Sequence, residues 1–476
     1  MMRSALTKLL SLGLVLALLM AMLLHVRDLV EDRKSYRAEA EESVVRGTAG
    51  PQSLVGPILL QQCTESWQER DEDGKPRKLQ QSLATTISPA RLQLDDARVT
   101  VTPLKLGLYP VNTFTLKTRV KAHFNADTLS PQSSRPGATL RCMPPVLALA
   151  IGDPRGIRRS DVQINQQALP VQSGTTLARH PQGIHAKLDS LVQPGGKFAA
   201  MDVEVDLELL GTSSLSIVPA ADDTSVKLSG NWPHPGFGGS FLPAQREIND
   251  QGFQAQWNVS SLATSAFSDF NAGAQVCAPS DDSAHSATMA AAARVDEASE
   301  VAHKACLDAF QVRFVNPVDP YKLADRAGKY GLLFVALTFV AVGMFEVLRQ
   351  LRVHPVQYLL VGSALAIFFL LLLSLSEHYP FALAYLAAAS ACVLLLGFYA
   401  SHILHGWKRG VPFGAGIALL YGLLFLLLQL EENALLVGSI ALFLVLALVM
   451  FATRRVNWYT LLDNTKPAYE GSGKVV

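Results

Sequence analysis

Hydrophobic residues are spread unevenly along the chain, and six long apolar runs stand out. A helix needs ~20 apolar residues to cross the ~30 Å hydrocarbon core of a bilayer, where unpaired backbone groups are very costly. Five of the runs follow one another closely, and helices formed by them would leave too little polar surface for a soluble protein. The pattern predicts six transmembrane helices, near residues 9–26, 330–348, 357–376, 381–404, 411–430 and 434–452.

Lysine and arginine in the short connections predict the orientation of these helices. Basic residues lie before the first run, after the second, between the fourth and fifth, and after the sixth: Arg3, Lys8, Arg349, Arg352, Lys408, Arg409, Arg454 and Arg455. The opposite connections have no basic residue and carry Glu377, His378, Glu431 and Glu432. Because short basic connections stay in the cytoplasm, we expect both termini inside and the long segment between the first two runs outside.

The first run has two interpretations, an uncleaved anchor or a cleaved signal peptide. Its end lacks a small-x-small cleavage site, and the nearest such triplet, Ala38-Glu39-Ala40, lies too far downstream. We therefore expect an anchor. Residues 28–46 are polar and mixed in charge, a composition that allows the helix to continue beyond the membrane to Gly47.

The long outer segment shows the alternation that is typical of half-buried strands. Apolar residues alternate with polar ones over 114–124 and again over 201–209, and further strand candidates lie near 91–94, 98–108, 214–218, 225–229 and 252–259. Proline and glycine separate these segments. The pattern favours an antiparallel sandwich or barrel, and a mixed α/β domain is the alternative.

The predicted solvent-exposed faces of the two alternating segments, 114–124 and 201–209, carry opposite charges. Lys117, Arg119 and Lys121 lie on the first, and Glu204 and Asp206 lie on the second. If the strands are neighbours, these charges pair across the sheet.

The predicted fold is a membrane protein with one N-terminal transmembrane helix, a large β-rich, sandwich-like outer domain and a C-terminal bundle of five transmembrane helices. Its four parts are the anchor (1–26), the β-rich domain (27–326), the five-helix domain (327–456) and a cytoplasmic tail (457–476).

Charge and cysteine content limit the classes of partner and the cellular compartment that fit the protein. The 41 basic residues balance 40 acidic ones without a long basic block, which argues against nucleic-acid binding. Four cysteines lie in the outer segment, which permits two disulfides in three connectivities. We favour Cys277–Cys306, which brackets an alanine-rich insert, and this leaves Cys63 with Cys142. Unpaired buried thiols are the alternative.

Motifs for catalysis, nucleotide binding and zinc binding are missing, so we predict no enzyme, no metal and no cofactor. Polar residues at the membrane edges are the remaining candidates, because such residues are often functional. Glu346 lies three residues before Arg349, which favours an interfacial ion pair. Glu377, His378, Glu431 and Glu432 could form a cation or proton entry point, or they could simply be solvated.

Several segments in the second half resemble the CreD inner-membrane protein family. The matching segments are Asn231-Trp232-Pro233-His234-Pro235, 237–243, 252–257, 318–321, 354–362, 373–378, 384–386, 421–424 and 453–459. The insert between Cys277 and Cys306 is longer than the family pattern. The resemblance implies a Gram-negative inner-membrane protein tied to cell-envelope integrity and expressed under the CreB–CreC two-component system. It also implies links to colicin tolerance and to the β-lactam response, but it supplies no catalytic residue.

The shared aromatic and proline segment is a candidate interaction loop, made of Trp232, Pro233, His234, Pro235, Phe237 and Phe241. It could dock an envelope protein or a lipid, or it could plug one end of the sandwich core.

We therefore expect a non-enzymatic protein of the bacterial inner membrane that acts through a periplasmic domain in an envelope-stress response. Its expected partners are the lipid bilayer and an envelope protein or lipid. A transporter or flippase of a small or lipidic envelope component is the alternative function. The sequence predicts no oligomeric state.

Overall fold

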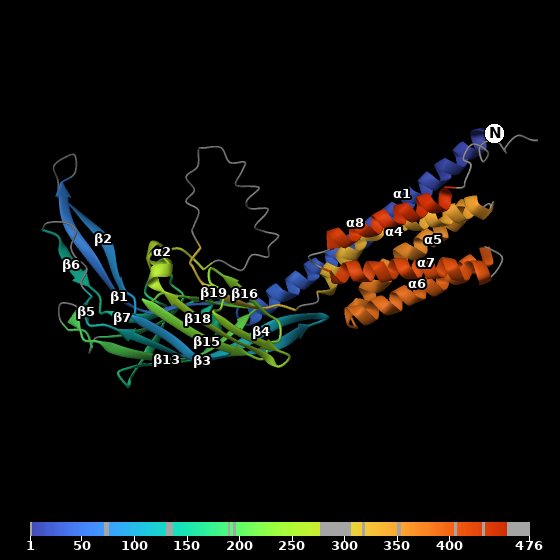
Figure 1. The fold of residues 1–476 in the computed structure, drawn as a ribbon. Coiled ribbons are helices and arrows are strands. Elements are labelled where there is room, and N and C mark those ends of the chain that lie inside the picture. The colour runs from blue at the N-terminus through green and yellow to red at the C-terminus, as the bar shows by residue number, and fades with distance from the viewer. Residues whose placement is uncertain are drawn as a thin grey trace, which may run out of the picture. The chain divides into compact units, whose positions relative to one another are not determined.

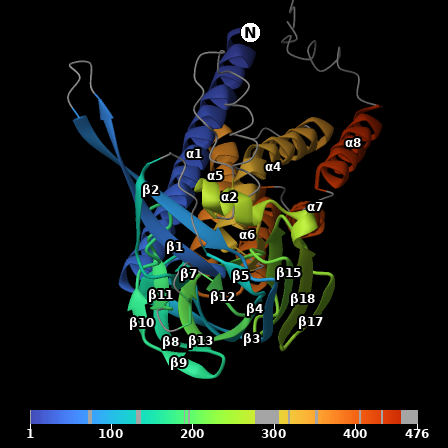
Figure 2. The ribbon, with the colours of Figure 1, turned by 90° about the vertical axis from the view of Figure 1, so that its left-hand side faces the viewer.

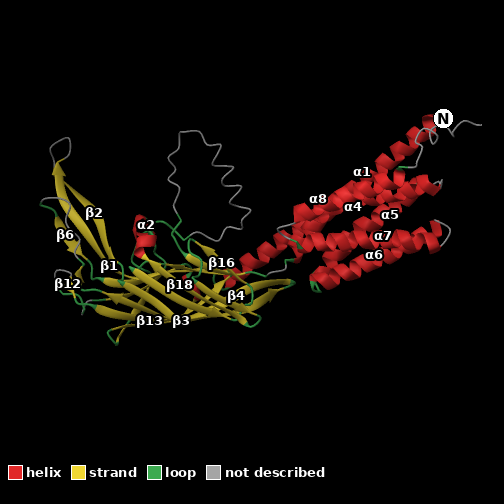
Figure 3. Ribbon diagram, viewed as in Figure 1, coloured by secondary structure: helices red, strands yellow, loops and turns green. Residues whose placement is uncertain are grey.

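The computed structural model describes residues 2–70, 76–129, 137–188, 191–193, 197–276, 306–316, 319–349, 354–403, 407–430 and 434–454 (Figure 1). The chain divides into two compact units, a helical unit (Met1–Ala38 with Val318–Val476) and a β unit (Glu39–Pro317). Figure 3 shows the two kinds of secondary structure in separate parts of the chain. The predicted fold class is confirmed: an N-terminal apolar helix, a β-rich middle region and a C-terminal cluster of apolar helices.

The helices of the helical unit lie where the apolar runs predict them. They are α1 (Met2–Gly47), α4 (Pro320–Arg349), α5 (Pro355–Ser376), α6 (Phe381–Ile403), α7 (Trp407–Gln429) and α8 (Ala434–Thr453). Among the described residues, four helical segments are long and apolar enough to cross a membrane: Leu10–Gly47, Pro355–Ser376, Phe381–His402 and Gly410–Gln429. A shorter apolar segment, Leu436–Phe451, lies in α8. The expected extension of the first helix to Gly47 is also confirmed.

Small residues allow these helices to approach closely. Gly362 of α5 receives the buried side chain of Leu19 from α1: a Cβ built on Gly362 would lie 2.2 Å from Leu19 Cδ1. On α7, Gly410 faces Ser401 of α6, and Gly414 faces Gly397. The spacing of Gly410 and Gly414 therefore serves close helix packing, as in other membrane bundles.

The β unit is a sandwich of two sheets. In the described residues, the nine-stranded sheet has the order β10 (Val171–Ser173), β11 (Gly183–Lys187), β7 (Val146–Ile151), β1 (Gln52–Arg70), β14 (Ser214–Val218), β19 (Phe310–Phe314) and β16 (Pro235–Gly239). β2 (Pro76–Ile87) and β6 (Thr139–Cys142) also pair with β1. The far ends of β1 and β2 form a hairpin that extends beyond the other strands (Figures 1 and 2).

The eight-stranded sheet, again counted over the described residues, faces the first sheet across the core. Its order is β17 (Gln245–Asn249), β18 (Gly252–Ser260), β15 (Asp223–Gly230), β3 (Arg91–Leu106), β4 (Tyr109–Phe124), β13 (Met201–Thr212), β8 (Ile157–Ile164) and β9 (Gln167–Leu169). The remaining elements are short: β5 (Asp127–Thr128) paired with β12 (Lys197–Phe198), the 3-10 turns η1 (Pro154–Gly156) and η2 (Ser261–Ala263), and α2 (Ala266–Ala272).

The sandwich is not purely antiparallel, which corrects the expectation from sequence. β1 pairs in parallel with β14, and β15 pairs in parallel with β3. Parallel neighbours require a long crossover connection, and here each pair joins strands that lie more than a hundred residues apart. The alternation along each strand therefore does not indicate these parallel pairs. The core between the sheets contains the inward residues of both, including Leu54, Phe114 and Trp257.

The opposite charges of the two alternating strands do lie side by side. β4 and β13 are antiparallel neighbours, and their register places Lys117, Arg119 and Lys121 opposite Glu208, Asp206 and Glu204. Arg119 Nε lies 2.7 Å from Asp206 Oδ1, and Lys117 Nζ lies 3.5 Å from Glu208 Oε2. The hypothesis of cross-strand pairing is confirmed.

The last turns of α1 belong to the β unit and are tied to it by hydrogen bonds. Ser213, in the turn between β13 and β14, donates from Oγ to Glu41 Oε1 at 2.7 Å. Thr212 Oγ1 donates to Ala49 O at 2.7 Å, and Arg155 Nη1 donates to Arg46 O at 3.0 Å. The end of the helix is thereby fixed beside the start of β14.

Replacing Gly410 by leucine should separate α6 from α7. A Cβ at this position would lie 2.6 Å from Ser401 Cα and 2.8 Å from Ser401 N, both backbone atoms that cannot move aside alone. We expect Gly410→Leu to lower the free energy of unfolding by about 1–3 kcal/mol, measured by thermal unfolding in detergent. Gly416→Leu is the control, because no atom lies within 4 Å of a Cβ there. Equal stability of the two variants would contradict this packing.

Candidate functional site

The outer face of the nine-stranded sheet, turned away from the sandwich core, is divided into an apolar part and a polar part. Its apolar part contains Val55 of β1, Ala150 of β7 and Val218 of β14, which pack against Phe270 of α2 and Leu307 in a second cluster. Further along the same two strands, β1 and β14 present serines instead. The apolar part is thus covered by α2, and the serines lie where this cover ends.

The cover also includes residues 174–182, which are bonded to α2 and the segment after it. The ring of His180 stacks on Phe270 at a centroid distance of 4.0 Å, and His180 Nε2 donates to Phe270 O at 2.9 Å. Arg179 Nη1 donates to Asn271 O at 2.9 Å, and Gln275 Nε2 donates to Arg179 O at 3.2 Å. Thr175 Oγ1 donates to the carbonyl oxygen of His180.

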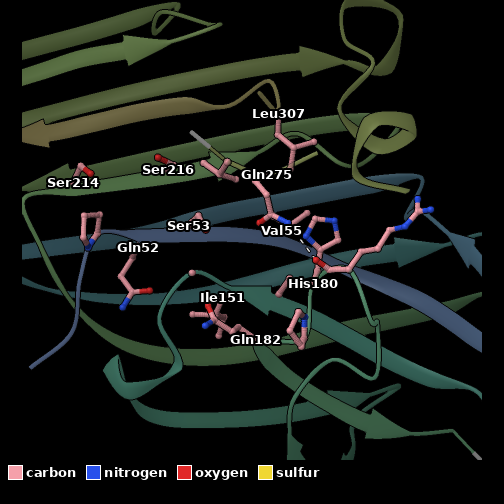
Figure 4. Close-up of a pocket in the computed structure, with 16 residues that line it drawn as sticks. Gln52, Ser53, Val55, Ile151, His180, Gln182, Ser214, Ser216, Gln275 and Leu307 are labelled. Atoms are coloured by element: carbon pink, nitrogen blue, oxygen red, sulfur yellow. Dashed lines mark hydrogen bonds between the residues drawn. The ribbon is translucent and has the colours of Figure 1, made fainter. Parts of the chain in front are cut away.

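A cavity of 430 Å³ lies between this cover and the polar part of the sheet. Its size is in the range of small-molecule sites. Figure 4 shows side chains from separate elements around one hollow. Its lining includes Ser53, Ser214, Ser216, Gln52, Gln182, Gln275, His180, Arg179, Val55 and Leu307. The amide of Gln52 is itself bonded to backbone groups of Asp153 and Leu210.

The three serines form a compact hydroxyl group on neighbouring strands. Ser53 and Ser216 are register partners in the parallel pair of β1 and β14. Ser216 Oγ accepts a hydrogen bond from Gln311 Nε2 at 2.9 Å, so its own proton is available. Ser214 is 1% exposed, and its Oγ has no hydrogen-bond partner in the described structure. Burying a hydroxyl without a partner costs free energy, so Ser214 is a group that a ligand could satisfy.

The described residues that line the cavity carry little net charge. Among the described residues that line it there is no carboxylate, and Arg179 is the one permanent cation. Burial lowers the pKa of His180 below the ordinary value, and the nearby charge of Arg179 acts in the same direction. Within the described residues, no group of three or more His, Cys, Asp and Glu side chains could hold a metal ion. The described lining can therefore bind a ligand by hydrogen bonds.

Of the predicted membrane-edge residues, the structure describes the side chains of Glu377 and His378. Glu377 is 8% exposed, and its Oε1 lies 3.4 Å from Arg33 Nε of α1. His378 is exposed, with Nδ1 3.3 Å from Ser374 O. Glu346 lies in α4, but its side chain is outside the described part, as are residues Glu431 and Glu432 entirely.

The Arg33–Glu377 contact is one of several ion pairs between α1 and the ends of its neighbouring helices. Lys34 Nζ lies 3.6 Å from Asp325 Oδ2, and Arg37 Nη1 lies 2.7 Å from Asp319 Oδ2. Burial acts to raise the pKa of Asp325, but its hydrogen bond from Lys329 and the charge of Lys34 outweigh this effect and lower it. These carboxylates are engaged in packing the helices.

The apolar members of the candidate interaction loop pack inward. Trp232, Phe237 and Phe241 lie against the sandwich core. Trp232 Nε1 donates to Val315 O at 3.1 Å, and the ring of Phe237 makes an edge contact with Trp257 at 5.8 Å. Pro233 and Pro235 are half-buried, and His234 is exposed. This packing favours the plug over a free docking surface.

Cysteine placement is partly described. Cys63 of β1 and Cys142 of β6 are register partners joined by a disulfide. Cys277 lies outside the described residues, so the Cys277–Cys306 pair stays a prediction. Cys392 is a free, buried thiol inside α6.

Sequence analysis missed the serine group and its cover. The run Ser214-Leu215-Ser216 did show alternation, but serine carries no strong sign of function by itself. Ser53, His180 and Gln275 reach the same cavity from distant parts of the chain, and no local pattern connects them.

Protonation of His180 at low pH should lower the stability of the cover formed by α2 and residues 174–182. The neutral ring donates to Phe270 O, and burial holds its folded pKa below the ordinary value of 6.5. The unfolded chain therefore binds a proton more readily, so the stability from this group is present above pH 6.5 and lost as the pH falls through the lower folded pKa. We expect His180→Phe to flatten this pH dependence in thermal unfolding, and the exposed His234→Phe control to retain it. An unchanged slope in His180→Phe would contradict the assignment.

Comparison with known proteins identifies the family. The family model for inner membrane protein CreD matches residues 4–459. Inner membrane protein CreD of Escherichia coli strain K12 is 35% identical over 450 residues, which cover 94% of this chain and 92% of that protein.

Likenesses to solved structures are much weaker. An M1 zinc metallopeptidase from Deinococcus radiodurans matches 36% of this chain and 38% of its own at 11% identity, with a TM-score of 0.20. A two-domain M1 zinc metallopeptidase bound to L-tryptophan gives a TM-score of 0.19 with the same coverage and identity. The chain thus spans well under half of these enzymes, and scores this low carry no argument. The match to the family model over nearly the whole chain means that the protein belongs to the CreD family of inner membrane proteins.

Proposed function

We propose that this protein supports the integrity of the cell envelope by binding an envelope component through its β unit, without catalysing a reaction. In this proposal the β unit lies in the periplasm, and both termini lie in the cytoplasm. The observation that carries it is the division of the chain into apolar, membrane-type helices and a large β unit with a cavity of ligand size. Membership of the CreD family supplies the link to the inner membrane.

The proposed orientation is supported by the basic residues in the short connections. The disulfide between Cys63 and Cys142 agrees with an oxidising compartment for the β unit. The exposed leucines of the helices, such as Leu394 and Leu419, agree with contact to lipid.

A binding role also fits the interior of the helical unit better than ion-coupled transport does. Transport paths through membranes are generally marked by acidic or basic side chains. In the described part of the helices, the fully buried polar side chains are neutral, for example Thr338, Ser376 and Tyr421. The acidic Glu377 lies at the end of α5 and is paired with Arg33.

Reporter fusions test the orientation. Alkaline phosphatase inserted near residue 200 should be active, because the enzyme needs the oxidising periplasm. Green fluorescent protein fused after residue 476 should fluoresce, because it folds in the cytoplasm. The reverse exchange of reporters serves as the control, and both of its signals should be lost. Fluorescence from position 200 would contradict the proposed topology.

Complementation of a deletion strain tests the function. Deletion should increase leakage of a periplasmic enzyme under envelope stress, and the intact gene should restore retention. Glu346→Gln and Glu377→Gln should also restore it, because a binding role does not need a titratable carboxylate at either position. Normal protein abundance is verified by immunoblot. Loss of complementation by an abundant glutamine variant would favour transport, and normal retention in the deletion strain would contradict the envelope role.

A further inference from the structure

We infer that the cavity on the outer face of the nine-stranded sheet is a binding site for a short saccharide. The inference rests on the proposed function, since it names the chemistry through which the β unit acts. Its evidence is the arrangement of hydroxyl, amide and apolar groups around one hollow (Figure 4).

The first step is the change of side-chain type along two paired strands. Val55 is the register partner of Val218, and two residues earlier Ser53 is the register partner of Ser216. Both valines lie in the cluster under α2, and Val55 also borders the cavity, which Ser53 and Ser216 line with hydroxyl groups. Polar side chains therefore begin where the cover ends, at positions where valine would otherwise continue the apolar face.

The second step is the unused hydrogen-bonding capacity of these serines. The hydroxyl of Ser214 is almost completely buried and has no partner among the described groups. Ser216 uses its oxygen to accept from Gln311, which leaves its proton free to donate. A buried hydroxyl is costly unless it is bonded. A ligand with both donors and acceptors would satisfy both serines at once.

The third step is the match between the lining and a ligand class. The serine hydroxyls and the amide of Gln182 can each donate and accept, which suits the hydroxyl groups of a sugar, whereas the amide of Gln52 is already bonded to Asp153 and Leu210. Val55 and Leu307 offer apolar surface to the C–H face of a sugar ring. A cation would require carboxylates, and the described lining residues include none. An anion would require Arg179, whose Nη1 already donates to Asn271 O. The cavity volume of 430 Å³ is large enough to hold a short saccharide segment.

Titration calorimetry on the full-length protein in detergent tests this site. The saccharide probes are N,N′-diacetylchitobiose, maltose and melibiose, and the other probes are D-alanyl-D-alanine and inorganic phosphate. We expect at least one disaccharide to bind, and the dipeptide and phosphate not to bind. Ser214→Ala and Ser53→Ala should each weaken the affinity about ten-fold, the effect of one lost hydrogen bond. Ser82→Ala, at an exposed position on β2, is the matched control and should bind normally.

Thermal unfolding of the unliganded variants separates a binding role from a structural one. Ser214→Ala should be at least as stable as the wild type, since it removes an unsatisfied hydroxyl. A clear loss of stability would overturn the inference, and so would binding of the dipeptide or phosphate in place of the sugars. Absence of binding by all three disaccharides would also overturn it.

Two further experiments distinguish a polymeric from a soluble sugar, and failure of the saccharide inference from failure of the proposed function. Co-sedimentation with purified peptidoglycan that a free disaccharide competes away would identify a polymeric glycan, whereas binding of free sugar alone would identify a soluble one. A Ser214→Ala protein that no longer binds sugar but still complements the deletion would separate this site from the envelope role. If the wild type complements the deletion but binds no sugar, the saccharide inference is wrong and the proposed function is unaffected.

Discussion

The parallel pairing of β1 with β14 is the contact on which both the core and the cavity of the β unit depend. Because side chains alternate along a strand, Leu54 and Leu215 enter the core while Ser53 and Ser216 stay on the outer face. A shift of one residue in either strand would exchange the two sets. The same register therefore buries the leucines and assembles the hydroxyl group.

The helical unit is held together by different means, because apolar side chains gain little from leaving lipid for another apolar surface. Close approach at Gly362, Gly410 and Gly414 supplies packing contacts within the bundle. Outside the apolar runs, the first helix is fixed by ion pairs such as Arg37 with Asp319. Close packing thus dominates along the apolar parts of the helices, and charge pairing dominates at the ends near Arg33 and Arg37.

Sequence predicted the parts of this fold whose signals are local. Apolar runs gave the helices, and alternation gave β4 and β13 together with their charge pairing. The parallel pairs were not predictable, because their partners are separated by long connections. The cavity was not predictable for the same reason, since Ser53, His180 and Ser214 meet only through that topology. The loop around Trp232 was predicted with two roles, and its hydrogen bond to Val315 O favours the structural one.

The junction between α1 and the β unit bears on how a soluble fragment could be excised for crystallisation. Glu41, Arg46 and Ala49 accept hydrogen bonds from Ser213, Arg155 and Thr212, and Gly50 N donates to Asp153 Oδ2 at 2.9 Å. A fragment that started at the first residue of β1 would discard all four partners. The turn before β14 would lose Glu41 and Ala49, and the segment of Asp153 and Arg155 at η1 would lose Gly50 and Arg46. The cut that preserves these contacts lies upstream of Glu41, so a faithful fragment has to carry the final turns of a membrane anchor as part of its own globular body.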